Sequence, residues 1–114
     1  MGEPQRVTME AVRAAVAAGR WTLTRHAREQ AGKRRVDSGD LVRAISEGEL
    51  LESYPADPRG PSALLLGEAG EGRPLHAVCA FDPGGELLII TVYEPAPPRW
   101  LNARTRNGPR EGAI

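Results

Sequence analysis

The sequence predicts an α+β domain, with two or three N-terminal helices packed on an antiparallel sheet of three or four strands. Apolar residues recur at helical spacing over the first 48 residues, and from residue 50 they form strand-like runs. The later connections are short and rich in Gly and Pro, which is typical of antiparallel hairpins. At 114 residues the chain suffices for one modest core and is too short for two.

The first helix is expected over residues 9–18. Thr8 can cap its N-terminus, and Gly19 is placed to end it. Residues 21–23 are short and extended, so they are either an edge strand or the lead into the next helix.

Two further helices are expected before residue 50. One spans about residues 25–34, with Gly32 weakening it near its middle. The next helix begins after Asp37. Asp37 and Asp40 together resemble a capping box at its start, and Gly48 is placed to end it.

The second half of the chain predicts a meander of strands. The four candidates are residues 50–54, 62–66, 75–81 and 87–93. The last of these is apolar on both faces up to Thr91, which indicates a central strand.

The domain itself is expected over residues 8–101. Residues 1–7 are assigned to a flexible N-terminus, and the polar, Arg- and Gly-rich residues 102–114 to a disordered tail. Trp100, which follows a Pro-Pro pair, is expected to hold the chain end against the body.

Composition excludes several classes of protein. No apolar run approaches 18 residues, so no membrane-spanning segment is predicted, and no signal peptide is evident. Cys79 is the single cysteine, which excludes an internal disulfide and fits a cytoplasmic protein.

Charge is unevenly distributed although the formal net charge is zero. Residues 20–36 carry six cations and one acidic residue, whereas residues 37–57 carry six acidic residues and one cation. We therefore expect a bipolar surface with at least one basic face.

The richest candidate for function is residues 24–36, which combine His26 with five cations. In a continuous helix His26, Gln30, Lys33 and Arg34 share a face, and Arg25 and Arg28 lie beside it. A histidine can donate or accept a proton near neutral pH, and arginines can hold a scissile phosphate. An ordinary solvated helix can carry the same residues, and the spacing alone does not decide.

Two later residues are further candidates. Tyr93 stands at a strand end, where it can hydrogen-bond a phosphate, stack on a base, or merely cover the rim of the core. His76 is a candidate only if its strand face is open. His76 and Cys79 point to opposite faces of a strand, so we predict no metal site and no cofactor, and Cys79 is expected in the core.

Several short motifs, in order over residues 20–100, resemble a small bacterial and archaeal domain family of unknown function. They are Thr24-x-His26-Ala27-x-Glu29, Arg34-x-Val36, Glu52-x-Tyr54-Pro55, Leu65-x-Gly67, Arg73-Pro74-Leu75-His76-x-Val78 and Ile90-Thr91-Val92-Tyr93-Glu94-Pro95. The resemblance implies a kinship with the RelE/ParE/BrnT-like toxins of type II toxin–antitoxin systems.

The resemblance implies a RelE-like fold and a metal-independent endoribonuclease that uses the ribose 2′-hydroxyl as nucleophile. It implies RNA as substrate, including mRNA on the ribosome, and a cognate antitoxin of the zinc-finger or helix-turn-helix type as partner. We accordingly expect His26 as general acid or base, Arg34 as phosphate ligand, and Tyr93 orienting the 2′-hydroxyl or leaving group. The substrate-binding residues would be Arg25, Arg28, Lys33, Arg35 and His76.

Three positions depart from the pattern that the resemblance implies. Gln30 replaces an expected arginine, Arg35 an expected glycine, and Ala31 an expected bulky apolar residue. The alternative function is therefore a non-catalytic module that binds RNA or protein through the same basic face, or an inactive toxin relative.

Overall fold

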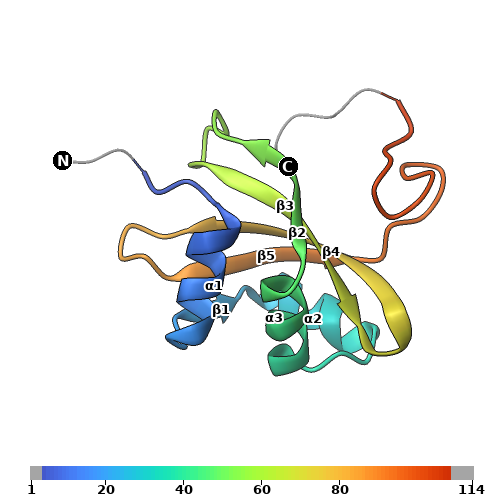
Figure 1. Cartoon of the computed structure of the whole chain (residues 1–114), viewed down its shortest axis with the longest axis horizontal. Coiled ribbons are helices and arrows are strands. Elements are labelled where there is room, and N and C mark those ends of the chain that lie inside the picture. Colours follow the sequence, from blue (N-terminus) through green and yellow to red (C-terminus); the bar gives the residue numbers. More distant parts are fainter. Residues whose placement is uncertain (1–3, 109–114) are drawn as a thin grey trace.

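The chain folds into three α-helices and a five-stranded sheet in the computed structural model, which describes residues 4–108 (Figure 1). In chain order the elements are α1 (Met9–Ala17), β1 (Trp21–Leu23), α2 (Arg25–Lys33), α3 (Ser38–Ser46), β2 (Glu49–Tyr54), β3 (Ser62–Ala69), the 3-10 turn η1 (Gly70–Gly72), β4 (Arg73–Phe81) and β5 (Leu87–Tyr93). The predicted α+β class is confirmed, with one strand more than expected.

The sheet order is β1-β5-β4-β3-β2, and β2 to β5 form an antiparallel meander. The extra strand is β1, which pairs in parallel with β5 at the edge of the sheet. The ambiguous extended segment is therefore an edge strand. Its partner lies more than 60 residues away in sequence, which is why local pattern left the choice open.

The helices begin where the sequence predicted. The side chains of Thr8, Thr24 and Asp37 each accept a hydrogen bond from a backbone N–H in the first turn of α1, α2 and α3. Each helix has nine residues, so no helix in the described part of the chain is long or apolar enough to cross a membrane.

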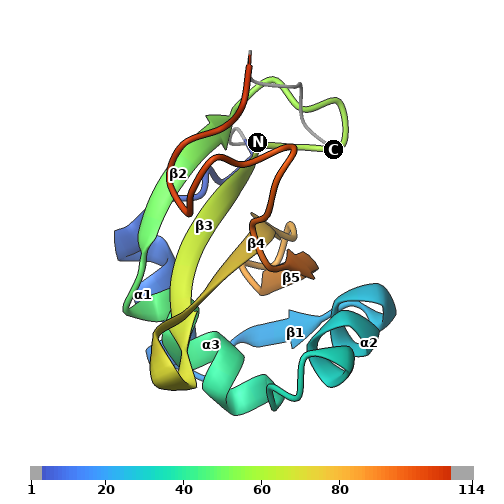
Figure 2. The same ribbon diagram turned by 90° about the vertical axis from the view of Figure 1, so that its right-hand side faces the viewer.

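The main core lies between the helices and one face of the sheet (Figure 2). Helical residues that enter it include Val12, Ala27, Ala31, Leu41 and Ile45. The buried Cys79 belongs to the same core, as expected. We call the opposite face of the sheet the outer face.

Two glycines allow α3 and its connection to β2 to cross β3 at close range. A Cβ atom on Gly67 would lie 2.6 Å from the carbonyl oxygen of Ala44, and one on Gly48 would collide with the carbonyl oxygen of Leu66. Gly67 belongs to the Leu65-x-Gly67 motif, so this motif has a packing reason.

The C-terminal segment, residues 95–107, crosses the outer face (Figure 2). Trp100 is buried there against Tyr54, Leu64 and Val78, which confirms its expected role.

The chain ends differ from the sequence prediction. Arg104 pairs with Glu49 at 2.6 Å and Arg106 with Glu52 at 2.9 Å, so residues 102–107 pack on β2 although a disordered tail was predicted. The polar composition of these residues predicted disorder. The sequence did not reveal their acidic partners, because those partners lie more than 50 residues earlier in the chain. Val7, assigned to a flexible N-terminus, is buried in the main core. Residues 109–114 lie outside the described residues.

Candidate functional site

Helix α2 is anchored along the edge of β5. The backbone N–H of Thr24 donates a hydrogen bond to the carbonyl oxygen of Ile89 (3.0 Å). The Thr24 hydroxyl donates a second one to the carbonyl oxygen of Ile90 (2.9 Å). Because β1 ends at Leu23, α2 continues along the edge that β1 leaves uncovered.

Gln30 completes this anchor. Its side-chain oxygen accepts a hydrogen bond from the backbone N–H of Val92 at 2.7 Å. A carboxamide thus satisfies an edge donor that β1 is too short to reach. Glutamine at this position therefore has a structural role of its own. His26 lies one turn earlier on the same side of α2 and is exposed.

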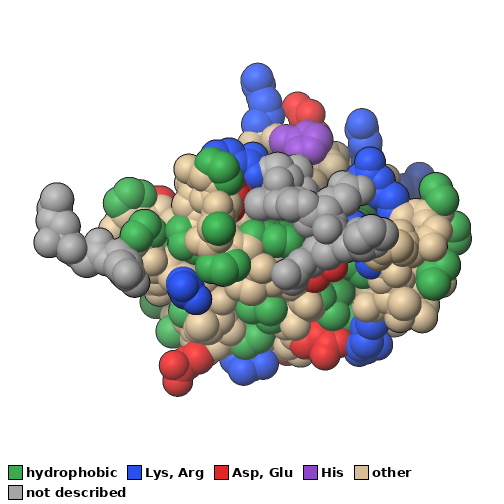
Figure 3. Space-filling model, turned by 90° about the horizontal axis from the view of Figure 1, so that it is seen from above, with side chains coloured by type: hydrophobic (Ala, Val, Ile, Leu, Met, Phe, Trp, Pro, Cys, Tyr) green, Lys and Arg blue, Asp and Glu red, His purple; other side chains and the backbone are tan. Residues whose placement is uncertain are grey.

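The exposed side of α2 is basic. Arg25, His26, Arg28, Lys33 and Arg35 are all exposed; we call them the basic surface. Within the described part of the chain, none of their side chains has a hydrogen bond or ion pair. In Figure 3 a His side chain lies on the upper edge with Lys, Arg and acidic side chains close by, and further Lys and Arg side chains lie elsewhere in this view.

Arg34 and Arg35 lie at the C-terminal end of α2 in special settings. Arg34 is half-buried, and its Nε is buried without a hydrogen-bond partner among the described residues. Arg35 has a φ of +57°, in the left-handed region. The N–H of Val36 reaches back to the carbonyl oxygen of Ala31 (3.0 Å), which closes a Schellman motif. Glycine, the residue expected here from the sequence, would adopt that φ without strain.

His76 lies on the outer face, and the C-terminal segment covers it completely. Its Nε2 lies 2.7 Å from the carbonyl oxygen of Ala103, so Nε2 carries the proton. Its Nδ1 then accepts from the Tyr93 hydroxyl at 3.1 Å. Burial lowers the pKa of His76, so the ring is held neutral.

Aromatic and charged side chains complete this arrangement. The ring of His76 meets Trp100 edge-on with centroids 4.3 Å apart, and Tyr93 at 5.2 Å. The Arg106 guanidinium stands 4.6 Å from the Trp100 ring centroid and makes two hydrogen bonds to Glu52, at 2.9 and 3.1 Å. The Tyr54 hydroxyl donates to the same carboxylate. We call Glu52, Tyr54, His76, Tyr93, Trp100 and Arg106 the outer-face cluster.

The structure thus separates the predicted site residues into two groups. Tyr93 and His76 are joined across β4 and β5 in the outer-face cluster. His26 and the α2 cations stay outside it, since no described hydrogen bond or ion pair links them to Tyr93 or His76. The condition set for His76, an open strand face, is not met. The sequence did not indicate the roles of Glu52 and Arg106, which depend on contacts between distant segments.

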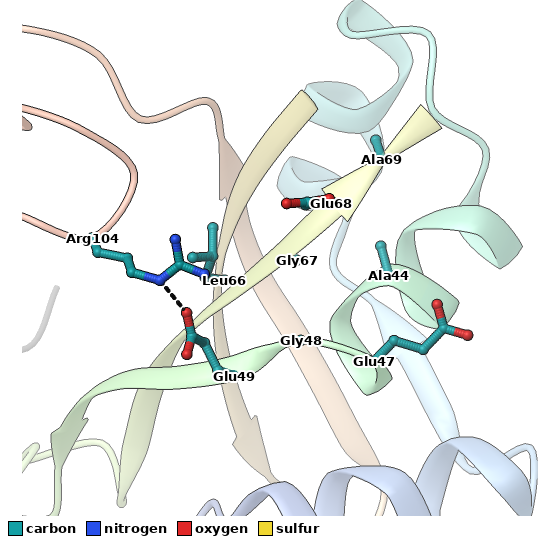
Figure 4. A pocket seen from close by; sticks show the side chains of 9 residues that line it. All are labelled: Ala44, Glu47, Gly48, Glu49, Leu66, Gly67, Glu68, Ala69 and Arg104. Carbon is teal, nitrogen blue, oxygen red and sulfur yellow. Dashed lines mark hydrogen bonds and ion pairs between the residues drawn. The ribbon is translucent and has the colours of Figure 1, made fainter. Parts of the chain in front are cut away.

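One hollow of about 430 Å³ lies where α3, β2 and β3 meet (Figure 4). Its lining includes Glu47, Glu49 and Glu68, and Arg104 bridges to Glu49 across it. None of the predicted site residues lines this hollow.

The fold and its surfaces define a small α+β domain with one basic, solvent-facing helix. The chain belongs to a family described as a domain of unknown function (DUF4258), which matches residues 23–94. No curated protein and no solved structure matches the chain. The matched range contains α2 and the strands β2 to β5, while α1 and the C-terminal segment lie outside it.

Proposed function

We propose that this protein binds RNA through the basic surface of α2, as a domain akin to the RelE/ParE/BrnT-like toxins. The observation that carries the proposal is that Arg25, Arg28, Lys33 and Arg35 are exposed on one anchored segment without partners in the described structure. Other arginines, such as Arg104 and Arg106, are paired with carboxylates. Cations without an internal partner are free to meet phosphates.

The anchoring of α2 supports this role. Thr24 and Gln30 fix the helix to β5 by side-chain hydrogen bonds, so the cations are presented on a rigid element. A rigid array loses less conformational entropy on binding a polyanion than a flexible tail would. The zero net charge of the chain does not oppose this, because local charge density governs the contact.

The test is the salt dependence of binding to a fluorescent single-stranded RNA. The variant Arg25→Gln/Arg28→Gln/Lys33→Gln should bind more weakly, and the slope of log K against log salt should fall by about 0.7 per lost phosphate contact. The matched control is Arg6→Gln/Arg13→Gln/Arg43→Gln, which removes the same charge from α1, α3 and the segment before α1. Equal weakening by both variants, or no salt-dependent binding by the unaltered protein, would overturn the proposal.

Cleavage of the bound RNA is a second candidate function, favoured by one observation. His26 is exposed among these cations, and its ring has no partner within the described residues. In this reaction the 2′-oxygen attacks the phosphorus and the bond to the 5′-oxygen of the next nucleotide breaks. The products are a 2′,3′-cyclic phosphate and a 5′-hydroxyl. His26 would accept the proton of the 2′-hydroxyl or protonate the leaving oxygen, and Arg28 would offset the charge on the phosphate.

Tyr93 and Arg34 enter this mechanism less readily than the sequence suggested. The Tyr93 hydroxyl is bonded to His76, and Arg34 is half-buried. We therefore assign the proton transfer to His26 and leave Tyr93 out of the proposed mechanism.

Cleavage is tested by following RNA integrity in a chelating buffer and after induced expression in bacteria. Replacing His26 by Ala should slow cleavage about 10²–10⁴-fold. Unchanged cleavage would remove His26 from the mechanism. If the unaltered protein binds RNA and does not cleave it, the result would support the non-catalytic binding module. The toxin kinship implies an antitoxin partner, which would cover the basic surface and compete with RNA.

A further inference from the structure

A second hollow, of about 230 Å³, lies over β4, β5 and the connection between β2 and β3. Val78 and Ala80 of β4 and Ile90 and Thr91 of β5 line it on the sheet. Asp57 and Arg59 line it from the connection, and we call this polar side the rim. The lining thus combines apolar side chains with a few polar ones, as small-molecule sites usually do.

Arg59 is held rigidly at this rim. The carboxylate of Asp57 accepts hydrogen bonds from the backbone N–H (3.0 Å), Nε (3.2 Å) and Nη2 (3.2 Å) of Arg59, and from the hydroxyl of Ser62 (2.9 Å). Hydrogen bonding by Arg59 lowers the pKa of Asp57 to about 2, so the carboxylate stays ionised. The Asp57 side chain is 3 % exposed and that of Arg59 63 % exposed, so a buried anion fixes the plane of a guanidinium that faces solvent.

A bulge in β5 contributes to the lining of the hollow. Val78 pairs with Thr91 and Cys79 with Ile89, so Ile90 has no partner on β4. Such a bulge locally bends a strand and redirects its side chains. The carbonyl oxygen of Ile90 also accepts a hydrogen bond from the hydroxyl of Thr24, the residue that caps α2. Ile90 therefore lines the hollow and also holds Thr24, which immediately precedes the basic surface.

We propose that this hollow binds one nucleobase of a single-stranded RNA whose phosphates lie on the basic surface of α2. The inference rests on the proposed RNA binding and extends it from the backbone to a base. Apolar side chains, a guanidinium held by a buried carboxylate and a threonine are groups that can stack on and hydrogen-bond an unpaired base. Ile90 lines the hollow and is bonded to Thr24, the residue before Arg25, so a strand bound across this part of β5 would lie against both regions.

The first test is an NMR titration with the four ribonucleosides, which carry no phosphate. We expect saturable shifts of the backbone amide signals of Arg59 and Thr91 with at least one nucleoside. Ala80→Leu fills the hollow and should abolish the shifts, whereas Ala56→Leu adds the same atoms on an exposed loop residue and should not. The α2 triple-glutamine variant should retain the shifts, because no phosphate is involved.

The second test uses a short oligoribonucleotide and its abasic counterpart. Ala80→Leu should weaken binding of the intact strand about 5- to 150-fold, the range for loss of one stacked base, and leave the salt slope unchanged. It should have little effect on the abasic strand. Thermal unfolding confirms that each variant is folded, and Arg59→Ala provides a second change at the rim.

The outcomes separate the two proposals. Salt-dependent RNA binding that is indifferent to Ala80→Leu, with no nucleoside shifts, would overturn the base site and leave the α2 proposal standing. Nucleoside shifts without any binding of the oligonucleotide would overturn the α2 proposal and leave only a nucleoside pocket. Shifts that persist in Ala80→Leu would show that nucleosides bind elsewhere.

Discussion

The outer-face cluster and the basic surface of α2 contain the same kinds of residue in opposite settings. In the cluster His76 is wholly buried with both ring nitrogens bonded, and Arg106 lies between Glu52 and Trp100. On α2 His26 and its neighbouring cations are exposed and have no partner within the described structure.

The difference separates residues that hold the fold together from residues that are free to bind a ligand. A buried histidine or arginine must be satisfied internally, because an unpaired polar group in the interior costs free energy. The cluster therefore fixes the C-terminal segment on the sheet. The exposed cations contribute little to stability, so their chemistry remains available to a ligand.

The largest expected effect is the loss of the His76 ring. His76→Ala should lower the free energy of unfolding by about 2–4 kcal/mol, because it leaves a cavity and unpaired groups on Tyr93 and Ala103. His26→Ala should change it by less than about 0.5 kcal/mol. Denaturant unfolding followed by circular dichroism measures both. A similar loss of unfolding free energy in the two variants would show that the buried and the exposed histidine contribute equally to stability.

The next effect concerns two ion pairs of unequal burial. Glu52→Gln should cost about 2 kcal/mol, because the side chains of Glu52 and Arg106 are only 12 % and 14 % exposed. Glu49→Gln breaks a pair whose side chains are 48 % and 65 % exposed, and should cost under about 0.5 kcal/mol. The same unfolding experiment compares them, and an equal cost would show that burial does not set the value of these pairs.

The pH dependence of stability should distinguish the two histidines. Burial lowers the pKa of His76 and Arg106 adds to this, while the hydrogen bond to Ala103 and the charge of Glu52 oppose it. The unfolded chain therefore binds more protons than the folded chain just below the ordinary histidine pKa of 6.5. Stability should be fully present above about pH 6.5 and decline as the pH falls from there toward the folded-state pKa. Unfolding curves between about pH 7.5 and 5 measure this decline. It should disappear in His76→Gln and persist in His26→Ala; the reverse result would mean that His26 is the linked group.

The smallest effect has the opposite sign and lies at the end of α2. Arg35→Gly should raise the free energy of unfolding by about 0.5–1 kcal/mol, because glycine relieves the left-handed φ of +57°. The same change should weaken RNA binding slightly if Arg35 contacts a phosphate. Destabilisation, measured by thermal unfolding, would mean that the Arg35 side chain stabilises the fold by contacts of its own.

Much of the local structure could be predicted from the sequence. Thr8, Thr24 and Asp37 cap the three helices because their side chains bond to N–H groups only a few residues away. The strand runs followed from apolar pattern and turn residues for a similar reason. The exposed basic helix could also be predicted, since the spacing of its cations and Ala27 determines which side faces the core.

The tertiary structure alone decided which chemical groups remain free. The parallel pairing of β1 with β5, the bond from Val92 to Gln30, and the burial of His76 under residues 95–107 each join segments far apart in the chain. The sequence by itself determined the helices, the meander and the charge of α2, because these depend on near neighbours. Only the fold could assign Tyr93 to His76 and leave His26 exposed, because a side chain's partners depend on which distant segments pack beside it.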